Sequence, residues 1–267
     1  MADRRLDIAL VTADQRRHAW FAAELARDPR LRLVGVVREA KRPVPSGETA
    51  EQHRLVSEHL AARDAAEERY FGEASDVEDL GVPVLDVAWG QSNAQSTADW
   101  VAGLGAGHLV LFGSSIIREP LLRDFDQRTI NIHLGLSPYY RGTASNFWPL
   151  VNGEPECVGA TVHLATLSVD AGPIIRQRRP DIARDDGSHD IGCKALIAGT
   201  AAMRDAICAL AEGGAQLVPQ RGGGRLYRAS DFHPGAVEEM RRRFANGMLG
   251  DYLDRKAERD HAYPIVE

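Results

Sequence analysis

Short apolar runs alternate with segments of helical spacing along the chain and predict an α/β protein. The runs are rich in apolar residues, and those at 6–12 and 108–113 are apolar at most positions, as expected of strands buried on both faces of a sheet. They occupy residues 6–12, 31–37, 82–88, 108–113, 129–134, 158–165 and 173–180. Helical spacing covers residues 15–27, 51–71, 96–104, 145–152 and 188–212. The strand–helix–strand opening favours a Rossmann-like, mostly parallel sheet with flanking helices.

The pattern changes after the last of these helices, which Ser188 is expected to cap and which the pair Gly213-Gly214 ends. We therefore expect a core domain over residues 1–212. A small C-terminal module of strands and a helix is expected over residues 213–267.

Within this module, residues 215–232 predict two short strands around a glycine turn, and residues 235–259 predict one charged helix. The helix contains the basic run Arg241-Arg242-Arg243, which a solvated helix face explains. The whole chain has 38 acidic and 32 basic residues, a net charge of −6 and a pI of about 5.9. Proteins that bind nucleic acids usually have a basic surplus, so we expect no nucleic-acid partner.

Composition excludes several other classes. A hydrophobic content of 44% and a charged content of 26% are typical of a globular domain. No apolar run approaches the length of a membrane span, and the N-terminus has no signal-peptide pattern, so we expect a cytoplasmic protein without a membrane partner. The cysteines Cys157, Cys193 and Cys208 form no CxxC pair, which argues against disulfides and a metal site. The first strand is followed by no GxGxxG motif, so a dinucleotide cofactor is unsupported.

Three polar residues form the candidate chemistry. Asn131 and His133 lie two positions apart near the end of a predicted strand, so their side chains share one face. Asp170 lies in the loop between the last two strands, and a hairpin there would bring it toward His133. A histidine moves protons near neutral pH, a carboxylate orients it, and an amide donates to an oxyanion. Such a set is suited to moving an acyl group onto an amine.

The surrounding stretch, residues 129–175, resembles the formyltransferase domain that uses 10-formyltetrahydrofolate. That family includes the glycinamide ribonucleotide, methionyl-tRNA and sugar N-formyltransferases. The resemblance rests on Asn131-Ile132-His133, Ser137-Pro138-Tyr139-Tyr140-Arg141-Gly142, Trp148, Gly153-Glu154, Gly159-Ala160-Thr161-Val162-His163 and Asp170-Ala171-Gly172-Pro173-Ile174. Leu134-Gly135 departs from the family, where many members carry Pro-Ser. The departure leaves the three polar residues intact and bears on the substrate more than on the chemistry.

The resemblance implies an enzyme in which Asn131, His133 and Asp170 are catalytic, with the division of proton transfer between His133 and Asp170 left open. It also implies that 10-formyltetrahydrofolate binds as co-substrate, without a metal, largely through main-chain groups. The implied cofactor-binding residues are Phe112, Gly113, Ser114, Ser115, Ile116 and Asp170. The implied acceptor-binding residues are Tyr139, Tyr140, Arg141, Gly142 and Trp148.

The acceptor is predicted from a narrower resemblance. Arg141-Gly142, Asn146-Phe147-Trp148-Pro149, Gly224-Arg225-Leu226-Tyr227 and Ser230-Asp231-Phe232 resemble sugar N-formyltransferases of the GDP-perosamine type. This implies a nucleotide-linked amino deoxysugar as partner, a role in lipopolysaccharide O-antigen biosynthesis, and a homodimer as one expected assembly.

Other functions stay open at this stage. The acceptor amine could instead belong to hydroxyornithine, glycinamide ribonucleotide or methionyl-tRNA, although the short, charged C-terminal segment and the acidic balance disfavour tRNA. The hydrolysis of formyltetrahydrofolate is another alternative. The hydrolase normally carries an N-terminal regulatory module, whereas this chain starts on its first strand. A Rossmann-like binding module without catalysis is disfavoured because all three polar residues are present.

Overall fold

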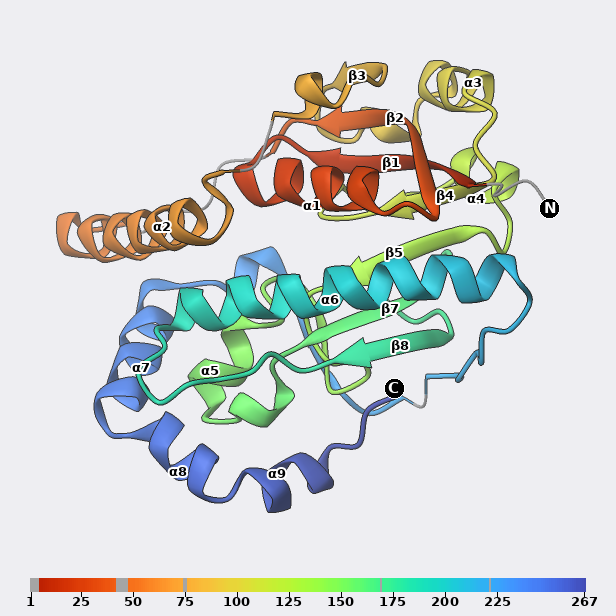
Figure 1. The fold of residues 1–267 in the computed structure, drawn as a ribbon. Coiled ribbons are helices and arrows are strands. Elements are labelled where there is room, and N and C mark those ends of the chain that lie inside the picture. Colours follow the sequence, from red (N-terminus) through yellow and green to blue (C-terminus); the bar gives the residue numbers. More distant parts are fainter. Residues whose placement is uncertain (1–4, 42–47, 74–75, 169, 221) are drawn as a thin grey trace.

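A seven-stranded sheet forms the centre of the computed structural model, which describes residues 5–41, 48–73, 76–168, 170–220 and 222–267 (Figure 1). Its order is β3-β2-β1-β4-β5-β7-β8. The strands are β1 (Leu6–Ala13), β2 (Leu31–Glu39), β3 (Val84–Val87), β4 (His108–Leu111), β5 (Thr129–His133), β7 (Ala160–Leu164) and β8 (Ile174–Arg178). β1 to β5 pair in parallel, whereas β7 is antiparallel to both β5 and β8. The predicted Rossmann-like, mostly parallel sheet is confirmed.

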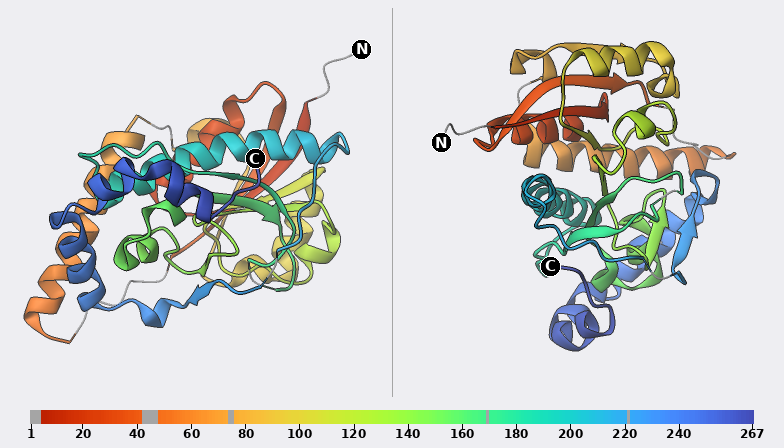
Figure 2. Two further views of the ribbon diagram at one scale, coloured as in Figure 1. Left: turned by 90° about the horizontal axis from the view of Figure 1, so that it is seen from below. Right: turned by 90° about the vertical axis from the view of Figure 1, so that its right-hand side faces the viewer.

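Helices cover both faces of this sheet, and two short strands pair outside it. The helices are α1 (Arg16–Arg27), α2 (Ala50–Phe71), α3 (Gln95–Gly103), α4 (Leu121–Asp124), α5 (Phe147–Asn152), α6 (Ser188–Ala211), α7 (Pro234–Ala245), α8 (Met248–Asp254) and α9 (Lys256–Ala262). The small second sheet consists of β6 (Tyr140–Gly142) and β9 (Arg225–Tyr227). The end of the molecule that carries α8 and α9 lies opposite the end that carries β2 (Figure 2).

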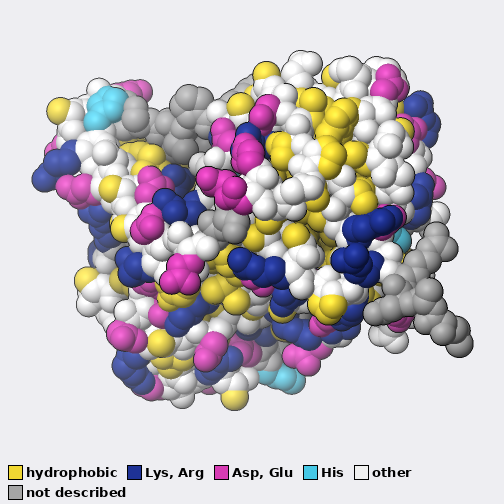
Figure 3. Space-filling view, turned by 45° about the horizontal axis from the view of Figure 1, so that its top comes forward, with side chains coloured by type: hydrophobic (Ala, Val, Ile, Leu, Met, Phe, Trp, Pro, Cys, Tyr) yellow, Lys and Arg dark blue, Asp and Glu magenta, His cyan; other side chains and the backbone are white. Residues whose placement is uncertain are grey.

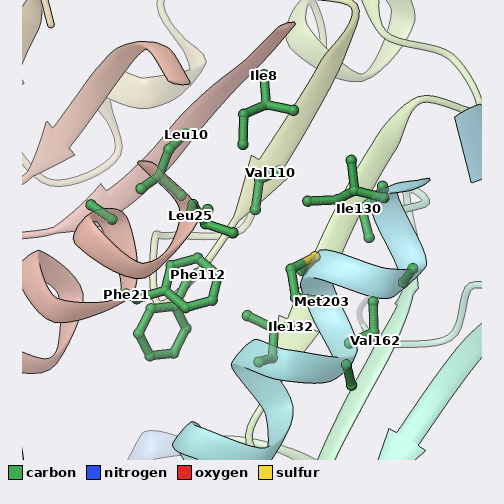
Figure 4. Packing of buried hydrophobic residues seen from close by; sticks show 14 of the residues in the cluster. Ile8, Leu10, Phe21, Leu25, Val110, Phe112, Ile130, Ile132, Val162 and Met203 are labelled. Atoms are coloured by element: carbon green, nitrogen blue, oxygen red, sulfur yellow. The ribbon is translucent and has the colours of Figure 1, made fainter. Parts of the chain in front are cut away.

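The core follows from the two-residue period of buried strands. On β1, Ile8 and Leu10 are buried in the cluster beneath α1 and α6, where Phe21 packs against Phe112 (Figure 4). The alternate residues Ala9 and Val11 are buried on the other face with residues of α3 and α4. Residues 8–11 of the strand are therefore all apolar and buried, because each face of the sheet has its own layer of helices.

Residues 215–232 do not form the predicted pair of neighbouring strands. Val218 makes an isolated antiparallel bridge with Ile174 of β8, whereas β9 pairs in parallel with β6. The main-chain groups of each segment therefore form hydrogen bonds with a strand that is distant in the sequence. The edge of β8 offers such groups, and a local hairpin would leave them unpaired.

Two further local predictions are wrong. The predicted helix over residues 235–259 is three helices, because Gly247 has a φ of +82° and Arg255 leaves the helical conformation. Ser188 begins α6 but does not cap it. Gly187 is the cap residue, and its N–H donates to Oδ2 of Asp190 at 2.9 Å, so the reciprocal half of a capping box replaces the expected serine cap.

The C-terminal helices share a hydrophobic cluster with the central part of the chain. Met240 of α7 and Tyr252 of α8 are buried together with Leu150 of α5 and Ile191 of α6. The boundary at residue 212 between two domains stays a prediction.

No helix in the described ranges combines the length and the apolar character needed to cross a bilayer. Acidic and basic side chains are interspersed over the face shown in Figure 3.

Two histidines, one buried on α2 and one partly buried on α6, join the N-terminal half of the molecule to α6. The rings of His59 on α2 and His189 on α6 have centroids 4.5 Å apart, and Phe147 of α5 lies at the edge of His59. Burial lowers the pKa of each histidine to about 4. The pair is therefore neutral in the folded protein at physiological pH.

We expect the melting temperature to fall as the pH drops from about 6.5, the ordinary pKa of histidine, toward 4. In this window the unfolded chain binds protons that the folded pair does not, at up to about 1.4 kcal/mol per pH unit for each proton. The measurement is thermal unfolding across this pH range. His59→Gln should flatten the dependence, while His53→Gln, at an exposed position of the same helix, should not. Equal slopes in both variants would contradict the assignment.

Candidate active site

The candidate site is built at the carboxyl end of β5, where the parallel part of the sheet meets the antiparallel part. In the register of β5 with β7, Asn131 lies opposite His163 and His133 lies opposite Thr161. Nδ2 of Asn131 is 3.0 Å from Nε2 of His163. The carboxyl edge of a parallel sheet is where such folds bind ligands, so these side chains occupy the expected position.

Asp170 reaches this edge from the loop between β7 and β8. Its Oδ2 lies 3.4 Å from Nδ1 of His133 and accepts the N–H of Gly142 at 3.1 Å. Its Oδ1 lies 3.7 Å from Nε2 of His163. The expected approach of Asp170 to His133 is confirmed. The loop achieves it with a left-handed φ of 48° at Asp170, a conformation that aspartate tolerates better than most residues.

The carboxylate of Asp170 is held in its charged form. Burial alone raises the pKa of this group, but the positive charge of His133 and the neighbouring ring of His163 lower it more strongly. The N–H of Gly142 acts in the same direction. The pKa of Asp170 is therefore well below its ordinary value, and the group is a fixed negative charge between two imidazole rings at neutral pH.

The ring of His133 is fixed from both sides. Its Nε2 lies 3.1 Å from the carbonyl oxygen of Tyr140, which can only accept a hydrogen bond, so Nε2 carries a proton. Nδ1 then faces Asp170. Gly135 packs directly against the ring, because a Cβ there would lie 2.7 Å from Nε2 and 2.5 Å from Cβ of Ser145. This contact gives the unusual Leu134-Gly135 pair a physical reason: a side chain at position 135 would displace the histidine.

His163 completes the group and was given no role in the sequence analysis. Its Nδ1 donates to the carbonyl of Leu164 at 2.8 Å, so in the neutral ring Nε2 accepts from the amide of Asn131. Asn131 thus uses one N–H on His163 and can direct the second at an oxyanion. The role of His163 could have been predicted only from the antiparallel pairing of β5 with β7, which places position 163 opposite position 131.

The predicted cofactor-binding segment follows β4, the neighbour of β5, with Leu111 in register with Asn131. Its first residue, Phe112, is buried in the core. The segment is anchored by Glu39 at the end of β2, which is fully buried. Glu39 accepts the N–H of Ser115 at 2.6 Å and its hydroxyl at 2.8 Å. The main chain next to Asn131 is therefore held rigidly.

The other residues of this segment differ in exposure. Gly113 has a φ of +68° and accepts a hydrogen bond from Lys41 through its carbonyl oxygen. The hydroxyl of Ser114 donates to the neighbouring carbonyl of Ser115 at 3.0 Å. The side chain of Ile116 is 49% exposed, an unusual value for a large apolar residue beside a catalytic edge. It offers apolar surface to a ligand.

The predicted acceptor-binding residues separate into two groups. Tyr140 and Trp148 are buried, and Trp148 stacks on Tyr227 with ring centroids 4.3 Å apart, so their rings pack inside the protein. Arg141 and Gly142 lie on the same short strand, β6, and the N–H of Gly142 bonds to Asp170. Nε of Arg141 is buried without a hydrogen-bond partner in the described part of the chain.

Tyr139 belongs to neither group. Its hydroxyl donates to the carbonyl of Pro264 at 2.8 Å, and its ring packs edge-on against Tyr263. It therefore ties the loop before β6 to the C-terminal residues.

Comparison with known proteins connects this geometry to a family. A family model described as formyl transferase matches residues 84–207, the part that contains Asn131, His133 and Asp170. Over these residues the chain is similar to formyl transferases, which transfer formyl groups.

Solved structures share the fold at low sequence identity. Phosphoribosylglycinamide formyltransferase of Anaplasma phagocytophilum is 18% identical with a TM-score of 0.58, over 84% of this chain and 99% of that one. Glycinamide ribonucleotide transformylase 1 of Symbiobacterium toebii is 22% identical with a TM-score of 0.57, over 82% and 96%. A sugar N-formyltransferase of Shewanella is 17% identical with a TM-score of 0.55, over 85% and 78%. Proteins that act on different amines thus share this architecture.

We expect Asp170→Asn and His133→Asn to lower kcat for formyl transfer by about a hundredfold or more, the usual effect of removing an acid–base or oxyanion-stabilising group. His163→Ala should lower kcat as well, because it releases the amide of Asn131. The measurement is the steady-state rate of each variant, with thermal unfolding as the test of folding. The control is His261→Asn, at an exposed position of α9. Folded Asp170 and His133 variants that stay within a few-fold of wild type would show that the assignment is wrong.

Proposed function

We propose that the protein transfers the formyl group of 10-formyltetrahydrofolate to the amino group of a nucleotide-linked amino deoxysugar. The observation that carries the proposal is the ionised Asp170 between His133 and His163, with the amide of Asn131 beside it, inside a formyl transferase domain. The folate supplies an activated formyl carbon, and the residues of this chain supply charge and proton transfer.

The residues act on the two charges that the reaction creates. The amine nitrogen bonds to the formyl carbon, and the carbonyl electron pair moves onto oxygen. The second amide N–H of Asn131 donates to this oxyanion, and the protonated ring of His133 supports it. Asp170 accepts the proton that the amine loses, directly or through a water. When the bond from carbon to the folate nitrogen breaks, that nitrogen takes up the proton that Asp170 accepted, passed on through water or the ring of His133. Asp170 is ionised again, and the formamide is released.

The segment after β4 fits the folate. Its main chain is held by Glu39 and lies next to Asn131 in the sheet, and Ile116 exposes apolar surface there. A flat heterocycle with a polar edge can use both features, through main-chain N–H and C=O groups and through apolar contact. This mode of binding is consistent with the small or apolar side chains of the segment. It requires that the main chain is held in one conformation.

Arg141 supports an anionic acceptor. It lies between Tyr140, whose carbonyl holds His133, and Gly142, whose N–H holds Asp170. Its Nε is buried and unpaired in the described chain, whereas buried guanidinium groups are normally paired. A phosphate group can provide the partner with two parallel hydrogen bonds. The diphosphate of a nucleotide-linked sugar has this chemistry, and the segments that resemble sugar N-formyltransferases meet here as β6 and β9.

The experiment that tests the proposal is mass spectrometry after incubation of the enzyme with 10-formyltetrahydrofolate and a panel of amines. We expect one formyl unit on a nucleotide-linked 4-amino deoxysugar and none on methionyl-tRNA. Arg141→Ala should raise KM for this acceptor without a matching fall in kcat, because it removes binding rather than chemistry.

Other outcomes of this panel are decisive. Formylation of glycinamide ribonucleotide or hydroxyornithine, with amino sugars unmodified, would replace the acceptor and retain the transfer. Release of free formate without a formylated amine would instead favour hydrolysis of the folate.

A further inference from the structure

We propose that residues 224–227 position the catalytic His133, because they hold the carbonyl group of Tyr140 in place. The inference rests on the proposed function for its kinetic consequence only. It assigns Nδ1 of His133 as the ring nitrogen that exchanges protons and Nε2 as the nitrogen that does not.

The first step is the bond between His133 and Tyr140. The carbonyl oxygen of Tyr140 lies 3.1 Å from Nε2 of His133 in a buried environment, so the neutral ring keeps its proton on Nε2. Nδ1 then faces Asp170, whose carboxylate stabilises a proton on it, so Nδ1 is the nitrogen that gains and loses a proton. If this carbonyl moved away, both tautomers would become accessible, and part of the population would present the wrong nitrogen.

The second step is that β9 fixes the main chain of Tyr140. Tyr140 pairs with Arg225, and Gly142 pairs with Tyr227. The N–H of Arg225 donates to the carbonyl of Tyr139 at 2.9 Å. At the far end of the pair, the N–H of Thr143 donates to the carbonyl of Tyr227 at 2.8 Å. The strand that holds His133 thus depends on a partner that is about 85 residues away in the sequence.

The third step is a polar clamp on the side chain of Tyr140. Its buried hydroxyl donates to Glu154 and accepts hydrogen bonds from Arg225 and from Nδ2 of Asn152, the latter at 2.8 Å. Arg225 and Glu154 also form a two-point ion pair at 2.8 and 2.9 Å. Burial and the carboxylate of Glu154 raise the pKa of Tyr140, so the hydroxyl remains a donor. Arg225 therefore holds Tyr140 by its main chain and by its side chain.

The fourth step is the close approach of the two chains. A Cβ on Gly224 would lie 1.5 Å from the carbonyl oxygen of Pro138. Gly142 has a φ of +86°, and a Cβ there would lie 2.1 Å from the carbonyl oxygen of Tyr227. Both contacts are with main-chain atoms, so a side chain at either position would separate β6 from β9. The glycines of residues 222–224 are thus not only a turn, because Gly224 permits the pairing.

The test compares Gly224→Ala and Arg225→Ala with Gly222→Ala. The control is matched, because a Cβ on Gly222 meets nothing within 4 Å. Nitrogen NMR of the His133 ring, recorded at a pH at which the ring is neutral, reports the tautomer without any substrate. We expect the Nε2-protonated form in wild type and in Gly222→Ala, and a mixture of tautomers in the other two variants.

The kinetic arm uses the same proteins. Gly224→Ala and Arg225→Ala should lower kcat by about 10- to 100-fold, leave the affinity for a folate analogue unchanged, and alter the pH dependence of kcat. If Gly224→Ala does not fold, Arg225→Ala carries the test alone. Folded variants with the wild-type tautomer would overturn the inference. If wild type transfers no formyl group, the proposed function fails, and the NMR result still decides the positioning.

Discussion

The contact between Asp170 and His133 is the interaction on which the rest of the site depends. A buried carboxylate loses several kcal/mol of hydration, and one partner rarely offsets this loss. A charge pair about 4 Å apart contributes about 4 kcal/mol at an effective dielectric constant of 20. Asp170 therefore needs the additional support that it receives from His163 and from the N–H of Gly142. The same support keeps the carboxylate ionised beside the ring of His133.

The fold delivers this arrangement by changing strand direction at one place. The parallel strands bring Asn131 and His133 to the carboxyl edge, where ligands bind. The antiparallel pair β7–β8 then returns a loop to the same edge and supplies His163 and Asp170. The close main-chain approach in this loop requires glycine at position 172, where a Cβ would lie 1.8 Å from the carbonyl oxygen of Leu164. The positions of the four polar side chains and the charge of Asp170 thus follow from the change from parallel to antiparallel strands between β5 and β7.

The sequence predicted those parts of the structure that depend on local pattern. Apolar runs gave the central strands, and the spacing of Asn131, His133 and Asp170 gave the candidate catalytic group, because period and motif are properties of short segments. The motif match strengthened this group, and the geometry places its three members together.

The remaining features depend on contacts between distant segments. The pairing of β9 with β6, the burial of Trp148 against Tyr227 and the anchoring of Ser115 by Glu39 have no local signal. The wrong prediction of two adjacent strands in residues 215–232 has the same origin, since an unpaired edge elsewhere in the fold took precedence.

Carbon NMR titration of the Asp170 carboxyl group tests the central claim most directly. The account predicts a pKa well below the ordinary value of aspartate in wild type, because the charge of His133, the neighbouring ring of His163 and the hydrogen bond from Gly142 outweigh burial. It also predicts that the pKa rises when His133→Gln removes the positive charge. A pKa at or above the ordinary value in wild type, or one that does not respond to this substitution, would contradict the account.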